Sequence, residues 1–357
     1  MKQWGREMNV TFFIGNGFDR NLGLQTTYDD FVKVYKDLDT DDPIIKRFRQ
    51  EIHDHQDLWS YAERELGRVT SKFQIGEGQA FSECQIDFCE HLAEYLKAQE
   101  ERIDFNAAEK EILKAFSRLN SISRSFPEQE QSAINGVYTS HAHEDISFRF
   151  ICFNYTRTLD KCVEIVKRHA GHLGGHTAKN GQRTHQLGNI CHVHGTIEEY
   201  MVFGVNDESQ IANESLFECE YGEIFKQMLI KIQANASYQE NTDAKAESLL
   251  RESSVIYVYG MSIGETDKLW WQRICKWLSQ NGERHLIVQK HAFSNKSVLP
   301  IKYFIAERQA KASITAYSDL EEDVKKSIEG RIHITGDNIF GAMSNLVDTY
   351  QRIPETV

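Results

Sequence analysis

The sequence predicts an α/β fold: a Rossmann-like parallel sheet with helices on both faces and a large helical insertion after the first strand. Two observations lead to this prediction. Short β-rich apolar runs alternate with segments whose apolar residues recur at helical spacing. Four of the runs also end in a small or polar signature. Because the carboxyl ends of parallel strands meet at one edge of a sheet, we expect these signatures to form one ligand site.

The first strand is expected at residues 10–14, and it leads directly into Gly15-Asn16-Gly17-Phe18-Asp19. A Gly-x-Gly after a buried strand lets the backbone turn tightly and approach a ligand, and the next helix can direct amides at a phosphate. A side chain at Gly15 would then occupy the space of the phosphate. Position 20 is Arg instead of the third glycine of a dinucleotide fingerprint, so an ordinary strand–helix turn remains an alternative.

The segment after this strand is predicted to be helical. Thr27 can cap a helix whose first turn carries Asp29 and Asp30. No convincing strand occurs between about residues 43 and 140, where apolar residues repeat at helical spacing. We therefore divide the chain into a Rossmann-like domain, residues 1–42 and 146–350, and a helical insertion, residues 43–145.

Further strands are expected after the insertion. Residues 148–153 lead into Asn154 and Tyr155, residues 190–194 into Gly195, and residues 255–259 into Gly260. Weaker candidates lie at 285–288 and 331–334, whereas the Gly- and His-rich segment 168–185 is expected to be a mobile surface loop. Its histidines should be exposed and bind no metal; they are His169, His172, His176 and His185.

Two residues at these strand ends could carry chemistry. Asn154 can donate and accept hydrogen bonds to a ribose or a water, although Asn is also a common turn residue. His194 can act as a general base near neutral pH, or it can be a satisfied histidine at a strand end. His192 would point to the same side as His194, but no third metal ligand is evident nearby, so we expect no metal.

Composition limits the function classes. The net charge is -12, with 41 Lys and Arg against 53 Asp and Glu, which disfavours non-specific nucleic-acid binding. The seven cysteines form no Cys-x-x-Cys pair, so we interpret them as reduced thiols of a cytoplasmic protein. No signal peptide and no apolar run of membrane-spanning length is apparent, so we expect no membrane association.

The motifs resemble those of the AbiH family, bacterial proteins linked to abortive infection by phage, over about residues 9–290. The resemblance rests on residues 13–19, Gly23-Leu24, residues 27–31, Trp59 with Glu63, residues 153–156, His194-Gly195, and residues 259–262 with Asp267. The family in turn is similar to sirtuin-like NAD-binding domains. This resemblance implies His194 and Asn154 as catalytic residues, and a cofactor-binding set of Gly15, Asn16, Gly17, Phe18, Asp19, Tyr155, Gly195, Gly260, Ser262 and Asp267. No sirtuin-type zinc-binding cysteine quartet is present.

Three functions follow as hypotheses. The first is an antiphage effector that cleaves the nicotinamide glycosidic bond of NAD, with the diphosphate on the Gly15–Gly17 loop, a polar ligand group on Asp19 and His194 as base. The second is a non-catalytic sensor of NAD, ADP-ribose or another nucleotide. The third is a nucleic-acid-acting toxin. A phage-derived trigger or a second defence component is an expected partner, and self-association stays open.

Overall fold

A seven-stranded sheet forms the centre of the described structure. The computed structural model describes residues 7–169, 172–178, 181–237, 241–293 and 300–351. Within these ranges the strand order is β3-β4-β2-β1-β5-β6-β7, and every neighbouring pair except β3–β4 is parallel. The strands are β1 (Glu7–Ile14), β2 (Asp145–Cys152), β3 (His172–Ala178), β4 (Gly181–His192), β5 (Val255–Tyr259), β6 (His285–Gln289) and β7 (Ile332–Thr335).

The predicted α/β, Rossmann-like fold is confirmed. The four segments expected to be neighbouring parallel strands are β4, β2, β1 and β5, side by side in the sheet. Residues along β1 are buried on both faces: Phe12 belongs to one apolar cluster and Phe13 to another. Burial on both faces is the reason why this strand reads as a continuous apolar run instead of an alternating one.

Helices cover both faces of the sheet. Those that share the cluster of Phe12 include α1 (Gly17–Asn21), α6 (Glu109–Ser117), α7 (Glu128–Ser140), α8 (Thr158–Arg168) and α15 (Leu346–Thr349). Those that share the cluster of Phe13 are α11 (Thr242–Arg251), α12 (Lys268–Gln280), α13 (Pro300–Ala316) and α14 (Glu322–Glu329). Both layers leave the carboxyl ends of the strands free for a third group of helices.

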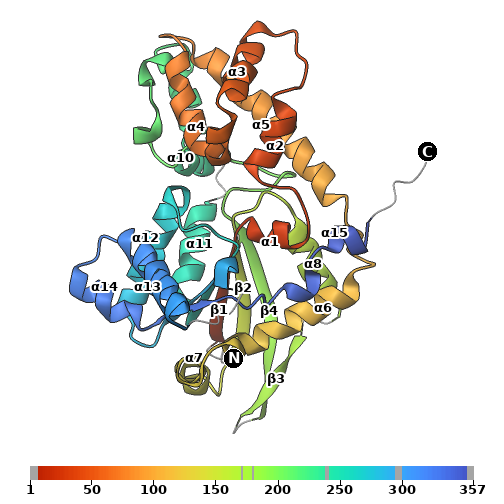
Figure 1. Ribbon diagram of the computed structural model, residues 1–357, viewed down its shortest axis with the longest axis vertical. Helices are drawn as coiled ribbons and strands as arrows, with labels where there is room; N and C mark the ends of the chain where they lie inside the picture. Colours follow the sequence, from red (N-terminus) through yellow and green to blue (C-terminus); the bar gives the residue numbers. More distant parts are fainter. Residues whose placement is uncertain (1–6, 170–171, 179–180, 238–240, 294–299, 352–357) are drawn as a thin grey trace, which may run out of the picture.

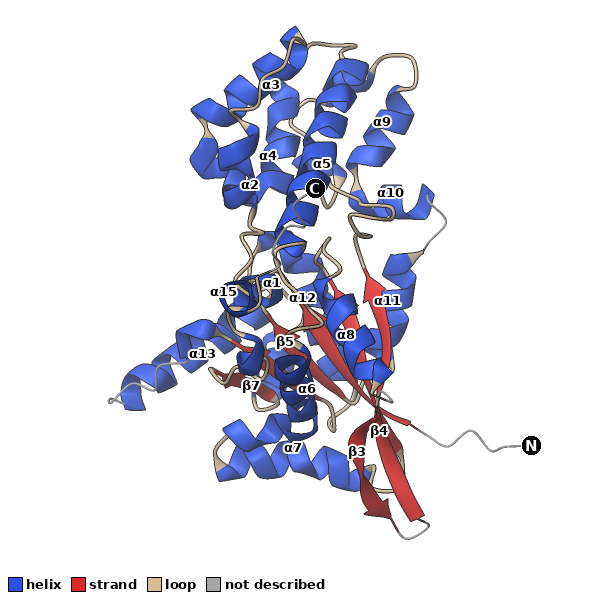
Figure 2. Cartoon of the chain, turned by 90° about the vertical axis from the view of Figure 1, so that its right-hand side faces the viewer, coloured by secondary structure: helices blue, strands red, loops and turns tan. Residues whose placement is uncertain are grey.

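That third group, here called the helical block, lies beyond the carboxyl ends of the strands (Figures 1 and 2). It comprises α2 (Tyr28–Tyr35), α3 (Pro43–Asp54), the 3₁₀ helix η1 (Gln56–Tyr61), α4 (Ala62–Val69), α5 (Gly78–Glu100), α9 (Gly222–Leu229) and α10 (Lys231–Ser237). Its own apolar cluster is rich in aromatic rings, including Phe31, Trp59 and Phe88. The predicted cap of α2 is present, because Thr27 and Asp30 exchange side-chain-to-backbone hydrogen bonds of 3.1 Å.

Apolar contacts cross the domain boundary that we expected at residue 145. Within residues 43–145, α3 to α5 belong to the helical block, whereas α6 and α7 pack against the sheet. Conversely, α2 and α9 lie outside that range in sequence and contribute to the helical block. The division into 1–42 with 146–350 and 43–145 therefore stays a prediction from sequence.

The expectation of a loop at residues 168–185 is wrong. Strand β3 pairs antiparallel with β4, and the resulting hairpin extends away from the body of the protein (Figures 1 and 2). The projecting part of the hairpin has few large apolar residues, so its sequence lacks the usual strand signal. Of the histidines predicted to be exposed, His169 is exposed and contacts Glu109 at 3.1 Å, while His185 is half-buried against Asn120 at 2.6 Å. The side chains of His172 and His176 lie outside the described part of the chain.

Among the described residues, none of the helices combines the length and apolar character that crossing a membrane requires.

Candidate functional site

A pocket of about 310 Å³ lies where the sheet meets the helical block. This volume is at the lower end of the range for small-molecule sites. Most of the residues predicted for the site line it: Gly15, Asn16, Asp19, Asn154, Tyr155, His194, Gly260, Ser262 and Asp267. The carboxyl ends of β1, β2, β4 and β5 therefore do converge, because adjacent parallel strands end at the same edge.

The three other predicted residues shape the pocket without lining it. Phe18 is fully buried and packs edge-on against Phe340, with ring centroids 5.2 Å apart. Gly195 has a φ of +70°, and a Cβ there would lie 2.0 Å from the carbonyl oxygen of Tyr200. A Cβ at Gly17 would lie 2.4 Å from the Cα of Gly260. These positions fix the backbone that carries the lining residues.

The glycine loop after β1 contacts the protein rather than presenting its amides to a phosphate. Gly15 N–H donates to the carbonyl of Tyr259 and Gly17 N–H to that of Gly260, both at 2.9 Å. A Cβ at Gly15 would lie 2.6 Å from the carbonyl oxygen of Gly260, so a larger residue would clash with backbone there. The spacing of the two glycines serves the close contact between the loops after β1 and β5, and a phosphate site at this loop stays a prediction.

Asn16 and Asp19 from the same loop also have protein partners. Asn16 Oδ1 accepts from the hydroxyl of Thr26 at 2.5 Å. Asp19 is buried, and its two oxygens accept from Thr156 at 2.6 Å and Thr158 at 2.5 Å. Burial raises the pKa of Asp19 to about 6, while the two hydroxyls lower it. Asp19 therefore ties the start of α1 to the turn after β2.

Asn154 has an unpaired polar atom. The side chain is 7% exposed, and its buried Nδ2 makes no hydrogen bond of ordinary geometry among the described residues, although the side chain is close enough to Asp19 to lower the pKa of that carboxyl. Leaving a buried donor unpaired costs about 1–3 kcal/mol. A ligand atom that accepts a hydrogen bond would remove this cost, so Asn154 is suited to hold a hydroxyl or carbonyl oxygen.

His194 also has a buried polar atom without a hydrogen-bond partner among the described residues. This atom is Nδ1, and the ring lies beside Phe153 and Tyr155, with centroids 6.0 and 6.5 Å away. Burial lowers the pKa of His194 well below the ordinary value, and the charge of Lys231 lowers it further. The imidazole is therefore neutral at pH 7, and the same two causes make its protonated form unfavourable unless a ligand compensates for them.

Ser262 and Asp267 form the wall opposite the sheet, after β5. The Ser262 hydroxyl donates to Asp267 Oδ2 at 2.5 Å. Burial raises the pKa of Asp267 to about 6, although the Ser262 hydrogen bond lowers it. A carboxyl group with such a pKa is mostly ionised at pH 7, but its pKa lies nearer to neutral pH than that of an exposed aspartate.

The predicted site set lacked the lining residues from the helical block, among them Lys231, Glu63 and Tyr28. Lys231 is 4% exposed, and its Nζ contacts Glu63 Oε2 at 2.8 Å. The other oxygen of Glu63 accepts from the hydroxyl of Tyr28 at 3.1 Å. Glu63 was singled out by the family resemblance alone, and nothing in the local sequence distinguishes Lys231 from an exposed lysine. Three carboxylates and one ammonium thus border the pocket: Asp19, Glu63, Asp267 and Lys231.

His192 does not share the pocket with His194. Its Nε2 contacts Asp160 Oδ2 at 2.9 Å, and its Nδ1 contacts the backbone oxygen of Asn154 at 3.2 Å. Burial alone would lower the pKa of His192, but Cys152 and Asp160 outweigh it and raise the pKa. A charged ring donates from both nitrogens, so His192 fastens the turn of Asn154 to α8.

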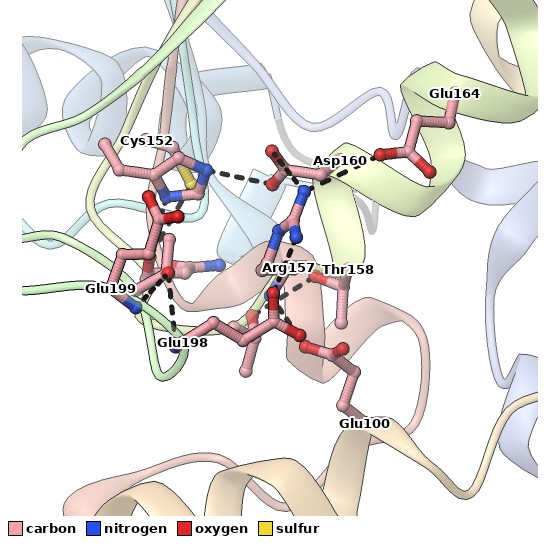
Figure 3. A network of polar contacts seen from close by, with 12 residues as sticks. Glu100, Cys152, Arg157, Thr158, Asp160, Glu164, Glu198 and Glu199 are labelled. Carbon is pink, nitrogen blue, oxygen red and sulfur yellow. Dashed lines mark hydrogen bonds and ion pairs between the residues drawn. The ribbon is translucent and has the colours of Figure 1, made fainter. Parts of the chain in front are cut away.

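A network of charged side chains surrounds Asp160. Figure 3 shows Arg157 between Asp160, Glu164 and Glu198, with the shortest contact, 2.6 Å, to Glu198. The backbone N–H of Arg157 also donates to Glu100 Oε2 of α5 at 2.6 Å. These contacts join the turn after β2 to the helical block, outside the pocket. Within the described ranges, no group of three or more His, Cys, Asp or Glu side chains is arranged to hold a metal ion.

The fold and pocket define an α/β protein with a small-molecule site at the carboxyl edge of a parallel sheet. Comparison with known families identifies the group: residues 11–289 match the family described as "Bacteriophage abortive infection AbiH". The chain belongs to the AbiH family, and its role is therefore in abortive infection by phage. A search of the curated proteins found no match.

Proposed function

We propose that the chain binds NAD, or a related nucleotide with an N-ribosyl bond, and cleaves the nicotinamide glycosidic bond during phage defence. One observation carries this proposal: Asn154 Nδ2 and His194 Nδ1 are buried and unpaired in residues of the same pocket. A ribose offers hydroxyl groups that can both accept from an amide N–H and donate to an imidazole nitrogen.

The charges of the pocket support a ribosyl-nicotinamide group as its occupant. This group is cationic before cleavage, and positive charge develops on the ribose as the bond breaks. The carboxylates of Asp19, Glu63 and Asp267 border the pocket and favour such charge. Lys231 is paired with Glu63, and the glycine-loop amides have backbone partners, so the pocket itself suits the ribosyl end rather than the diphosphate.

Roles follow for the individual residues. Asn154 orients the ribose or the attacking water through its amide. His194, held neutral by burial, accepts the proton of the water. Asp19 acts indirectly, because its hydrogen bonds with Thr156 and Thr158 hold the two strand ends at their separation. We place this reaction in the cytoplasm, with a phage-derived signal or a second defence component as the trigger.

A nucleotide sensor is the second candidate. Glu63 and Lys231 reach the pocket from the helical block, while the unpaired groups come from the sheet. A bound nucleotide such as ADP-ribose would contact both parts and alter their contact. In this case the nucleotide is bound but not cleaved, and the altered position of the helical block changes the binding of a partner protein.

A time course of NAD with the purified protein separates these functions. Nicotinamide release that disappears in His194→Ala and Asn154→Ala, with NAD binding retained, supports the glycohydrolase. NAD or ADP-ribose binding without release supports the sensor. If neither nucleotide binds and oligonucleotides are retained with a strong salt dependence, a nucleic-acid-acting toxin replaces both.

A further inference from the structure

A second, much smaller cavity of about 30 Å³ adjoins the main pocket. The two cavities share the lining residues His194, Lys231, Thr266 and Asp267. We call the smaller one the side chamber. Its remaining walls come from the segment after β4, α10 and the start of α12, including Val193, Asn235 and Trp270, and also from Asn206 and from Asp243 of α11. His194 therefore borders both the side chamber and the main pocket, where the ribose would bind.

The side chamber has the size and polarity of a water site. A water molecule needs roughly 10–15 Å³ on this measure and two to four polar partners, so the chamber has room for about one or two waters. Lys231, Asp267 and Thr266 are among its lining residues, although Lys231 Nζ also contacts Glu63 at 2.8 Å and Asp267 Oδ2 accepts from Ser262 at 2.5 Å. His194 adds the imidazole whose Nδ1 has no hydrogen-bond partner among the described residues. An apolar cavity of this volume would stay dry, whereas this one is lined by charged groups.

We propose that the side chamber holds the water that attacks the ribosyl carbon, with His194 as the acceptor of its proton. This inference rests on the proposed function and adds the identity and place of the nucleophile. Two features carry it: the chamber opens on the same imidazole that lines the main pocket, and Lys231 and Asp267 can orient a water on that imidazole.

The reaction balances with water as the only co-reactant. The water oxygen forms a bond to the anomeric carbon, and the carbon–nitrogen bond to nicotinamide breaks. The electron pair of that bond stays on the ring nitrogen, so nicotinamide leaves as a neutral molecule without needing a proton. One proton of the water passes to neutral His194 and then to solvent after the products leave. NAD⁺ and water thus give ADP-ribose, nicotinamide and one proton.

The chamber makes the site selective for hydrolysis over transfer. A bound water is already in place beside the base, whereas an alcohol must first displace that water. Ethanol has three heavy atoms and exceeds the space of one or two waters. The site should therefore form ADP-ribose even when ethanol is present as a competing nucleophile.

The chamber can be filled by one methylene. Val193 is fully buried and lines the chamber, so Val193→Ile extends a side chain into a space of that order. Val163 on α8 is equally buried but belongs to the cluster on the other face of the sheet, and Val163→Ile is the matched control. We expect Val193→Ile to slow nicotinamide release at least about tenfold with unchanged NAD affinity, and Val163→Ile to change neither.

Two measurements on the full chain test the inference. A high-resolution crystal structure of the ligand-free protein should show a water within about 2.7–3.2 Å of His194 Nδ1, absent in Val193→Ile. Product analysis of the wild-type protein in ethanol should show less ethyl ADP-ribose than the ethanol-to-water ratio predicts. If nicotinamide is released but the chamber holds no water, the inference is overturned. It is also overturned if ethyl ADP-ribose forms in proportion to the ethanol concentration. If the wild-type protein releases no nicotinamide, the proposed function itself fails.

Discussion

Two histidines that are two residues apart have opposite surroundings in this protein. His192 contacts the Asp160 carboxylate and a backbone carbonyl, and its pKa is raised. His194 has an unpaired Nδ1 beside Lys231, and its pKa is lowered. The difference arises because β4 ends at His192, so the first imidazole reaches α8 while the second turns into the pocket. The charged ring of His192 stabilises the fold, whereas the neutral ring of His194 is the one that we assign to catalysis.

The largest effect on stability should follow from breaking the contact of His192. Removing one partner of a buried ion pair leaves the other charge uncompensated and costs roughly 3–5 kcal/mol. Asp160→Asn should therefore lower the free energy of unfolding by that order at pH 7, as measured by urea denaturation. The raised pKa of His192 means that its stabilisation is complete below pH 6.5 and is lost only as the pH rises through the folded-state pKa. If His194→Ala lowers the free energy of unfolding by the same amount, the two histidines do not differ in their contribution to stability.

A smaller loss of stability should follow from crowding the glycine loop. Gly17→Ala places a Cβ against the Cα of Gly260, and overpacking of this kind typically costs about 1–3 kcal/mol. The thermal midpoint should fall, because the loops after β1 and β5 must separate to make room for the Cβ. Gly282→Ala, where a Cβ meets nothing within 4 Å, is the control. Weaker NAD binding in Gly17→Ala without any loss of stability would restore the loop as a phosphate site.

The smallest effect concerns pH. Because burial raises the folded-state pKa of Asp19 to about 6, the folded protein retains a proton that the unfolded chain loses near pH 4. The contribution of Asp19 to stability therefore falls as the pH rises from about 4 to 6, and stays at the lower level above that. Asp19→Asn should reduce the difference in thermal midpoint between pH 5 and pH 7.5. An unchanged difference would mean that Asp19 is ionised at both values.

The sheet edge could be predicted from sequence, because each of its strands carries a local signal. The apolar runs before Asn154 and Gly260 and the turn residues after them place both positions correctly at the pocket. The role of the glycine loop could not be predicted, because a Gly-x-Gly that approaches another backbone has the same sequence as one that approaches a phosphate. Only the register of β1 with β5 distinguishes the two.

The rest of the site depends on contacts between distant segments. Lys231 and Glu63 meet through a 2.8 Å contact although 168 residues separate them, and neither has a neighbour in sequence that reveals the pairing. The side chamber likewise exists only where α10, the end of β4 and α12 meet. The projecting part of the β3–β4 hairpin was missed for another reason: residues 174–184 include no large apolar residue, so no apolar pattern indicates a strand there.

The central claim is tested most directly by following nicotinamide release from NAD in the wild-type protein, His194→Ala and His192→Gln side by side. Removing a general base typically lowers the rate by about 10²–10⁴-fold. We expect His194→Ala to show this loss with an unchanged thermal midpoint. His192→Gln should lose stability but, at a temperature where it is folded, retain most of the turnover. Release that survives His194→Ala at the wild-type rate, or that is absent from the wild-type protein, would contradict the account.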